Sequence, residues 1–219
     1  MRLIRWLVRL IKAALVVGVL AVVAALIIPV NLHLVEQNQY PTLPNGCEAV
    51  SASVALIGLG VPITAESFAT QYLPKTDIGA SSPAEAYQGD PFGNGYYCYP
   101  DPLVTGINNF LQTQSTSLEA KSHKLVSVSE IILRLHANKP VIVWSTVNDK
   151  LAEREDTVVW QNGSREYHPY SNLHVMVVDG VQGGKVHLVD SVNGSRWMSL
   201  LQFIPLYYSM GLRAVYFTA

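Results

Sequence analysis

The longest apolar stretch of the chain lies near its N-terminal end, at positions 13–30, which carry no charged or hydrogen-bonding side chain. Its 18 residues approach the ~20 that a helix needs to cross a bilayer. Basic residues precede it, and the next Lys or Arg is Lys75. The positive-inside rule then predicts a cytoplasmic segment at 1–12, a transmembrane signal anchor at 13–30 and an extracellular domain at 31–219.

A cleaved signal peptide is the alternative interpretation of this stretch, and it would leave a secreted domain. The apolar region of such peptides usually has about 7–15 residues, and Ala24 and Ala25 offer small side chains for cleavage. The apolar run continues past them through Ile27 and Ile28, however. We therefore favour the uncleaved anchor.

Helical spacing of apolar residues dominates the first half of the remaining chain. The predicted helices lie at 47–59, 64–72, 101–112 and 127–138, with a short one opening at the capping box Ser82-Pro83-Ala84-Glu85. The second half of the remaining chain has mainly strand-like patterns. Strands are predicted at 140–146, 174–179, 185–190 and 213–218, with a short helix near 198–204 and a polar loop at 147–172. Helices followed by an antiparallel sheet indicate an α+β fold.

Charge and cysteine content exclude several classes of protein. The formal net charge of the 219 residues is −1, and four of the basic residues lie before the apolar segment, outside the domain at 31–219. A mildly acidic domain argues against nucleic acid as a partner. The two cysteines, Cys47 and Cys98, are too few for a disulfide scaffold, although one disulfide between them stays open.

Cys47 has the most informative surroundings in the sequence. The turn residues Pro44, Asn45 and Gly46 deliver it to the first position of a predicted helix. The unpaired N–H groups and the positive dipole end there favour a thiolate, so Cys47 is a candidate nucleophile. The alternative is a small buried hydrophobic residue, which is common for free cysteine.

A cysteine nucleophile needs a base and a group that orients the base. His174 opens one strand of the predicted hairpin, and Asp190 closes the other. Antiparallel pairing brings these two ends together, so the hairpin predicts an imidazole beside a carboxylate. Asp179 lies at the turn end of the same hairpin and is the weaker candidate.

Several blocks of the sequence together resemble the C-39-like cysteine peptidases of bacteria, which are papain-like relatives of the bacteriocin double-glycine leader peptidases. The matching blocks lie at 31–37, 43–48, 89–91, 96–100, 139–144, 174–178 and 189–191. In two places this chain departs from the family pattern: His33 replaces a proline, and Ser191 follows Asp190 where the family usually has proline.

The resemblance implies a papain-like domain that hydrolyses peptide or isopeptide bonds through an acyl-enzyme. It implies Cys47 as nucleophile, His174 as base, Asp190 as orienter and Gln37 as oxyanion donor, with Gln39 as a second choice for the glutamine. The implied partner is a peptide or protein substrate, including cell-envelope protein. No metal or other cofactor is expected, since the chain has no Cys-x-x-Cys and no His-Glu-x-x-His.

Two other functions remain open from the sequence. A catalytically inactive papain-like module would use the same cleft to bind peptides or cell-wall fragments, and an unreactive Cys47 would favour it. Transfer of the acyl group to an amine would share the acyl-enzyme with hydrolysis.

Overall fold

The computed structural model describes residues 2–162 and 165–218. The helices are α1 (Arg2–Ile27), α2 (Cys47–Gly58), α3 (Ala65–Gln71), α4 (Pro100–Leu111), α5 (Val128–His136) and α6 (Leu200–Ser209). The strands are β1 (Val30–Asn31), β2 (Lys75–Thr76), β3 (Tyr87–Gln88), β4 (Glu119–Lys121), β5 (Val141–Thr146), β6 (Trp160–Asn162), β7 (Arg165–Tyr167), β8 (Leu173–Gln182), β9 (Lys185–Val189), β10 (Arg196–Ser199) and β11 (Ala214–Thr218).

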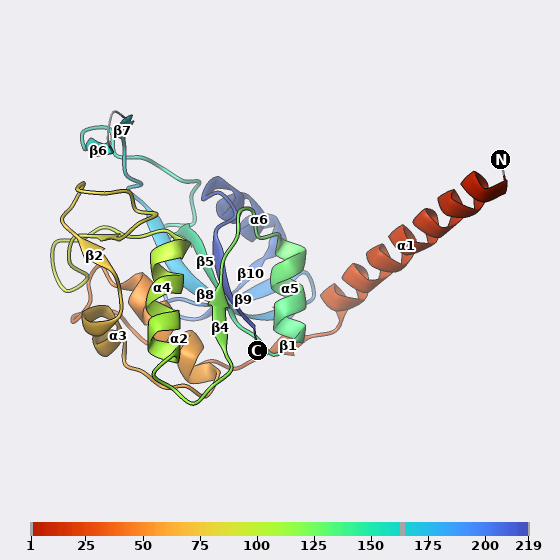
Figure 1. The fold of residues 1–219 in the computed structure, drawn as a ribbon, viewed down its shortest axis with the longest axis horizontal. Helices are drawn as coiled ribbons and strands as arrows, with labels where there is room; N and C mark the ends of the chain where they lie inside the picture. Colours follow the sequence, from red (N-terminus) through yellow and green to blue (C-terminus); the bar gives the residue numbers. More distant parts are fainter. Residues whose placement is uncertain (1, 163–164, 219) are drawn as a thin grey trace.

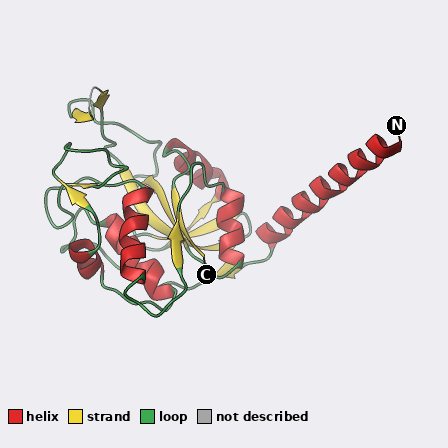
Figure 2. Cartoon of the chain, viewed as in Figure 1, coloured by secondary structure: helices red, strands yellow, loops and turns green. Residues whose placement is uncertain are grey.

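One antiparallel sheet organises the domain (Figure 1). Its strands follow the order β10-β9-β8-β5-β11-β4, and β1 pairs with β8 on the side. Figure 2 shows the strands gathered at the centre with helices around them. This arrangement confirms the predicted α+β class and its antiparallel sheet.

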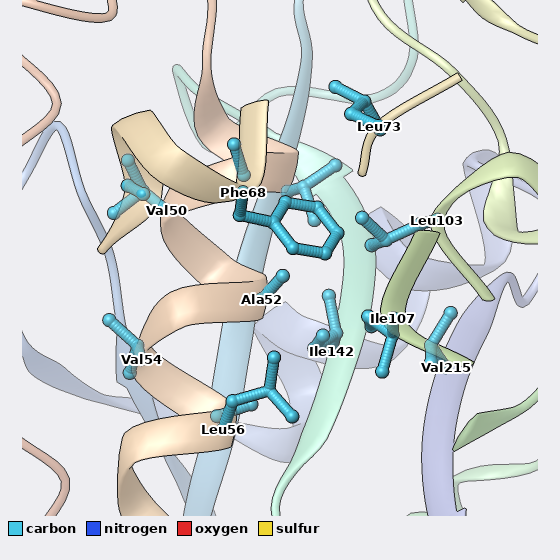
Figure 3. Packing of buried hydrophobic residues seen from close by; sticks show 14 of the residues in the cluster. Val50, Ala52, Val54, Leu56, Phe68, Leu73, Leu103, Ile107, Ile142 and Val215 are labelled. Carbon is cyan, nitrogen blue, oxygen red and sulfur yellow. The ribbon is translucent and has the colours of Figure 1, made fainter. Parts of the chain in front are cut away.

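The sheet has an apolar cluster on each face because its central strands are buried on both sides. Ile142 and Trp144 of β5 pack with α2, α3 and α4, whereas Val141 and Val143 pack with α5 and α6. Figure 3 shows the ring of Phe68 from α3 lying close to Ala52 of α2 and Leu103 of α4. Helix α2 is thereby buried along most of its length and held rigidly against the sheet.

The hairpin of β8 and β9 contains one irregularity. Gly180 pairs with His187, but the next pair is Val178 with Leu188, so Asp179 is an extra residue in β8. The Asp179 carboxylate is fully buried, lies 2.6 Å from Nδ1 of His187 and accepts the N–H of Leu34 at 3.0 Å. These contacts fix the bulge in place.

Most predicted elements are confirmed, and the exceptions have local causes. The capping box at Ser82 forms only a turn, in which Glu85 N–H donates to Ser82 C=O at 2.8 Å, because no apolar helical repeat follows it. Strands β1, β4 and β10 were not predicted, since each is short and pairs along a sheet that other segments build. The loop at 147–172 carries the small hairpin of β6 and β7.

Helix α1 extends away from the rest of the molecule (Figure 1). Among the described residues, no helix has both the length and the apolarity that crossing a bilayer demands. The transmembrane anchor predicted at 13–30 is therefore not supported by the structure.

Candidate active site

The turn before α2 places Cys47 at the first position of the helix, as predicted. Gly46 N–H donates to the C=O of Leu43 at 2.9 Å and closes the turn. A Cβ atom at Gly46 would lie 2.6 Å from Cβ of Leu43, so the turn has room only for glycine before the cysteine. A residue outside this turn fixes Asn45, because the Asn45 side chain donates to Gly93 C=O at 2.7 Å.

The Cys47 thiol points to a carboxylate. Its Sγ donates to Oε2 of Glu48 at 3.3 Å, and only 6% of the residue is exposed. Burial, followed by the charge of Glu48, raises the pKa of the Cys47 thiol well above its usual value. Burial and the charge of Glu48 therefore oppose the thiolate that the helix dipole was expected to favour. A helix dipole contributes only about 0.3–1 kcal/mol, too little to offset burial and a neighbouring negative charge.

Glu48 is fully buried between the two cysteines. One carboxylate oxygen accepts from the Cys47 thiol, and the other accepts the backbone N–H of Cys98 at 2.8 Å. Burial raises the pKa of Glu48 to about 7 despite these hydrogen bonds. Both cysteines are free thiols, so no disulfide joins Cys47 to Cys98 in this structure.

His174 and Asp190 meet as the hairpin predicts. Nε2 of His174 lies 2.7 Å from Oδ1 of Asp190, and both residues are buried. An ionised carboxylate only accepts hydrogen bonds, so the ring proton of neutral His174 lies on Nε2. Nδ1 is then the nitrogen free to accept a proton from another group.

Asp190 has more partners than the sequence suggested. Its Oδ1 accepts the N–H groups of Val192 and Asn193, and its Oδ2 accepts Nη1 of Arg196 at 2.5 Å. Burial alone would raise the pKa of Asp190, but the hydrogen bond and charge of His174 and the Arg196 guanidinium lower it far below its usual range. Asp190 therefore stays ionised beside the imidazole.

The cysteine and the histidine approach the same end of β8. The backbone of Val175, the residue after His174, contacts the Cys47 thiol, and Ser51 of α2 donates to Val175 C=O at 3.1 Å. Within the described chain, no hydrogen bond joins the thiol of Cys47 to the His174 ring. The sulfur of Cys47 is turned toward Glu48.

The two candidate glutamines lie in different places. The Gln37 amide donates to Oγ of Ser53 at 3.2 Å. Ser53 lies six residues after Cys47 in α2, which is about 9 Å along the helix axis. Gln39 is buried, donates to Pro44 C=O at 2.8 Å and accepts from Oγ of Ser191 at 2.7 Å. The structure therefore brings Gln39, not Gln37, to the Asp190 end of the site.

A cluster of tyrosines joins the 147–172 loop to the segment that holds Cys98. The hydroxyl of Tyr167 lies 2.7 Å from that of Tyr97 and 2.6 Å from that of Tyr99. Arg154 of the same loop stacks on Tyr170 with its Cζ 4.1 Å from the ring centroid. The loop also reaches the other half of the site, because Asp149 binds Arg196 at 2.9 Å. Sequence periodicity gave no signal for these contacts.

Comparison with known proteins gives the family of this chain. A model of the Peptidase_C39 like family matches residues 30–214. The uncharacterized protein YvpB of Bacillus subtilis (strain 168) is 27% identical over 193 residues, which cover 85% of this chain and 74% of YvpB. A crystal structure described as a C39-like peptidase from Bacillus anthracis shares the fold, with a TM-score of 0.75 and 20% identity over 88% of this chain and 98% of that one. Because the family match spans most of the chain, the protein belongs to the Peptidase_C39 like family and is assigned to the cysteine peptidases.

Proposed function

We propose that the protein hydrolyses peptide or isopeptide bonds through an acyl-enzyme formed on Cys47. The observation that carries this proposal is the buried 2.7 Å contact of His174 with Asp190, beside the strand residue that touches the Cys47 thiol. A base that a carboxylate holds in one tautomer and a cysteine at a helix N-terminus are the two groups that nucleophilic catalysis requires, and this supports the proposal.

In the proposed mechanism the Cys47 side chain turns from Glu48 toward His174. Nδ1 of His174 takes the thiol proton, and the sulfur attacks the substrate carbonyl. The imidazolium then gives that proton to the leaving amine, and water completes the hydrolysis. Asp190 keeps the ring oriented and stabilises its positive charge, while Arg196 holds the carboxylate.

The oxyanion would bind at the start of α2. The residue before this helix is Gly46, which makes no side-chain cap, so N–H groups of the first turn can serve a developing negative charge. For the additional side-chain amide we favour Gln39 over Gln37, since Gln39 lies between Pro44 and Ser191.

We further propose that the domain at 31–219 acts outside the cytoplasm on peptides or envelope proteins, as a secreted or anchored protein. The support is the uneven charge of the N-terminal segment, which has four basic residues before position 13 and none from there to Lys75. Fractionation of expressing cells, with N-terminal sequencing of the recovered protein, tests the location. Recovery only from the cytoplasm would contradict it.

The test of the activity is a peptide-library cleavage screen with wild type, Cys47→Ala and His174→Ala. Cleavage is expected only from the wild type. Cys98→Ala removes the other buried thiol and should retain cleavage, so it separates loss of a nucleophile from loss of a sulfur atom. Cleavage that survives Cys47→Ala in a protein with an unchanged circular dichroism spectrum would disprove the mechanism.

A non-catalytic peptide-binding module is the second candidate, and one observation favours it. The Cys47 thiol is buried and hydrogen-bonded to Glu48, and burial raises its pKa, as expected of an unreactive cysteine. Under this alternative, peptides from the library would bind the wild type and Cys47→Ala equally, and neither protein would cleave them.

A further inference from the structure

Glu48 is a buried acid that the proposed reaction does not use. It follows the nucleophile in the chain, is 0% exposed and contacts the sulfur itself. A solvent-exposed acid in the first turn of a helix stabilises that helix through the dipole. Glu48 is buried, so the role of an exposed first-turn acid does not explain it. Burying a carboxylate is unfavourable unless its partners compensate.

Among the residues that the structure describes, no positive charge compensates the charge of Glu48. The groups that face it are the Cys47 thiol of α2, Cys98 before α4, and Tyr87 of β3. His174 stands on the neighbouring β8, and the acids of α3 and α4, Glu66 and Asp101, are exposed. Within the described part of the chain, no Lys, Arg or His forms an ion pair with Glu48.

A carboxylate and a thiolate in contact would be two buried negative charges. Such a pair resists the second ionisation strongly, so the charge of Glu48 and the charge of Cys47 exclude one another. The 3.3 Å contact between the Cys47 sulfur and the Glu48 carboxylate fits this exclusion, because a protonated thiol can donate to a carboxylate.

We propose that Glu48 is a positioning residue for Cys47: its carboxylate holds the protonated thiol in the resting site, and neutralising that carboxylate releases the sulfur for ionisation. The proposal rests on Cys47 being the nucleophile proposed above. Because burial brings the pKa of Glu48 to about 7, the carboxylate gains its charge in the neutral range, and above that range it opposes ionisation of the thiol.

The experiment measures alkylation of Cys47 by iodoacetamide from about pH 5 to about pH 9, where thiolate is the reacting form. Mass spectrometry of the digested protein reports Cys47 and Cys98 separately. The wild-type rate should level off above about pH 7, since further proton loss there ionises Glu48 instead of the thiol.

Glu48→Gln keeps the size of the side chain and an oxygen for the Cys98 N–H, but loses the charge. Its rate should be about twofold faster than the wild-type rate at pH 7, where Glu48 is about half neutral, and roughly tenfold faster at about pH 8, and it should rise steadily with pH. Glu66→Gln, an exposed acid in the first turn of α3, should match the wild type. Glu48→Asp keeps the charge and should remain slow.

Equal rates for Glu48→Gln and wild type, or equally fast reaction of Glu48→Asp, would overturn the proposal and leave Glu48 as a structural link to Cys98. If Glu48→Gln does not fold, the wild-type profile still decides, because a tenfold rise per pH unit through neutrality contradicts the proposal. Alkylation needs no substrate. A protein that cleaves no peptide but shows the Glu48 effect would therefore refute the peptidase function alone.

Discussion

Arg196 donates to Asp190 at 2.5 Å and, through its other terminal nitrogen, to Asp149 at 2.9 Å. One guanidinium thus links the carboxylate that orients His174 to the first residues of the 147–172 loop. Lysine has no planar fork and could not bind both acids in this way.

Arg196→Ala should lower the free energy of unfolding by about 1–3 kcal/mol, because a hydrogen bond to a buried charged group is lost. It should also lower kcat, since Asp190 loses a partner that fixes its position. Urea unfolding and cleavage rates measure the two effects. Lys121→Ala removes an exposed pair with Glu119 and serves as the control, with a change of about 0–1 kcal/mol expected. Equal effects of the two variants would contradict the linking role of Arg196.

Asp190 should dominate the loss of stability in acid. Its pKa is lowered in the folded protein, so its stabilisation is complete above the ordinary pKa of an aspartate, about 3.9, and disappears as the pH falls below that value. The wild-type free energy of unfolding should therefore decline below about pH 4. Asp190→Asn should be less stable at neutral pH and show a flatter acid decline. Asp101→Asn, at an exposed position, should follow the wild-type curve.

Gln39 and Gln37 offer a direct comparison. Gln39→Ala leaves the buried Ser191 hydroxyl and Pro44 carbonyl without their partner, which should cost about 1–3 kcal/mol of stability and lower kcat. Gln37→Ala loses only the contact with Ser53 and should change kcat less. A selective fall in kcat for Gln37→Ala would restore Gln37 as the oxyanion donor implied by the family resemblance.

Tyr167→Phe should loosen the 147–172 loop, because the hydroxyl that Tyr97 and Tyr99 both contact is removed. Limited trypsin digestion at Lys150 and Arg154 should become faster while the unfolding temperature changes little. Tyr208→Phe, at an exposed position on α6, is the matched control. Unchanged digestion of Tyr167→Phe would show that the stacking of Arg154 holds the loop without the hydroxyls.

The parts that the sequence predicted well depend on neighbours along the chain. The Ser127 cap, the hairpin and the turn before Cys47 are short-range patterns, and each is confirmed. The meeting of His174 with Asp190 followed from the hairpin alone.

The parts that the sequence missed depend on burial and on distant contacts. Nothing local shows that Glu48 folds back onto the thiol and is sealed from water, so the thiolate prediction considered only the helix dipole. Arg196 belongs to an edge strand that a polar turn separates from Asp190, and no periodicity links them. The glutamine could not be assigned because its position depends on contacts with Ser53 and Ser191 far along the chain.

The additional residue at Asp179 determines which side of the sheet Asp190 faces relative to His174. Val177 stands opposite Val189, so the same register sets Asp190 against Met176, which shares its side of the sheet with His174. In an unbroken ladder Asp190 would fall opposite Val177 and project from the reverse side. Deleting Asp179 would thus separate the His174 imidazole from the Asp190 carboxylate without changing either residue. The acid that seemed the weaker candidate is what lets the stronger one reach its histidine.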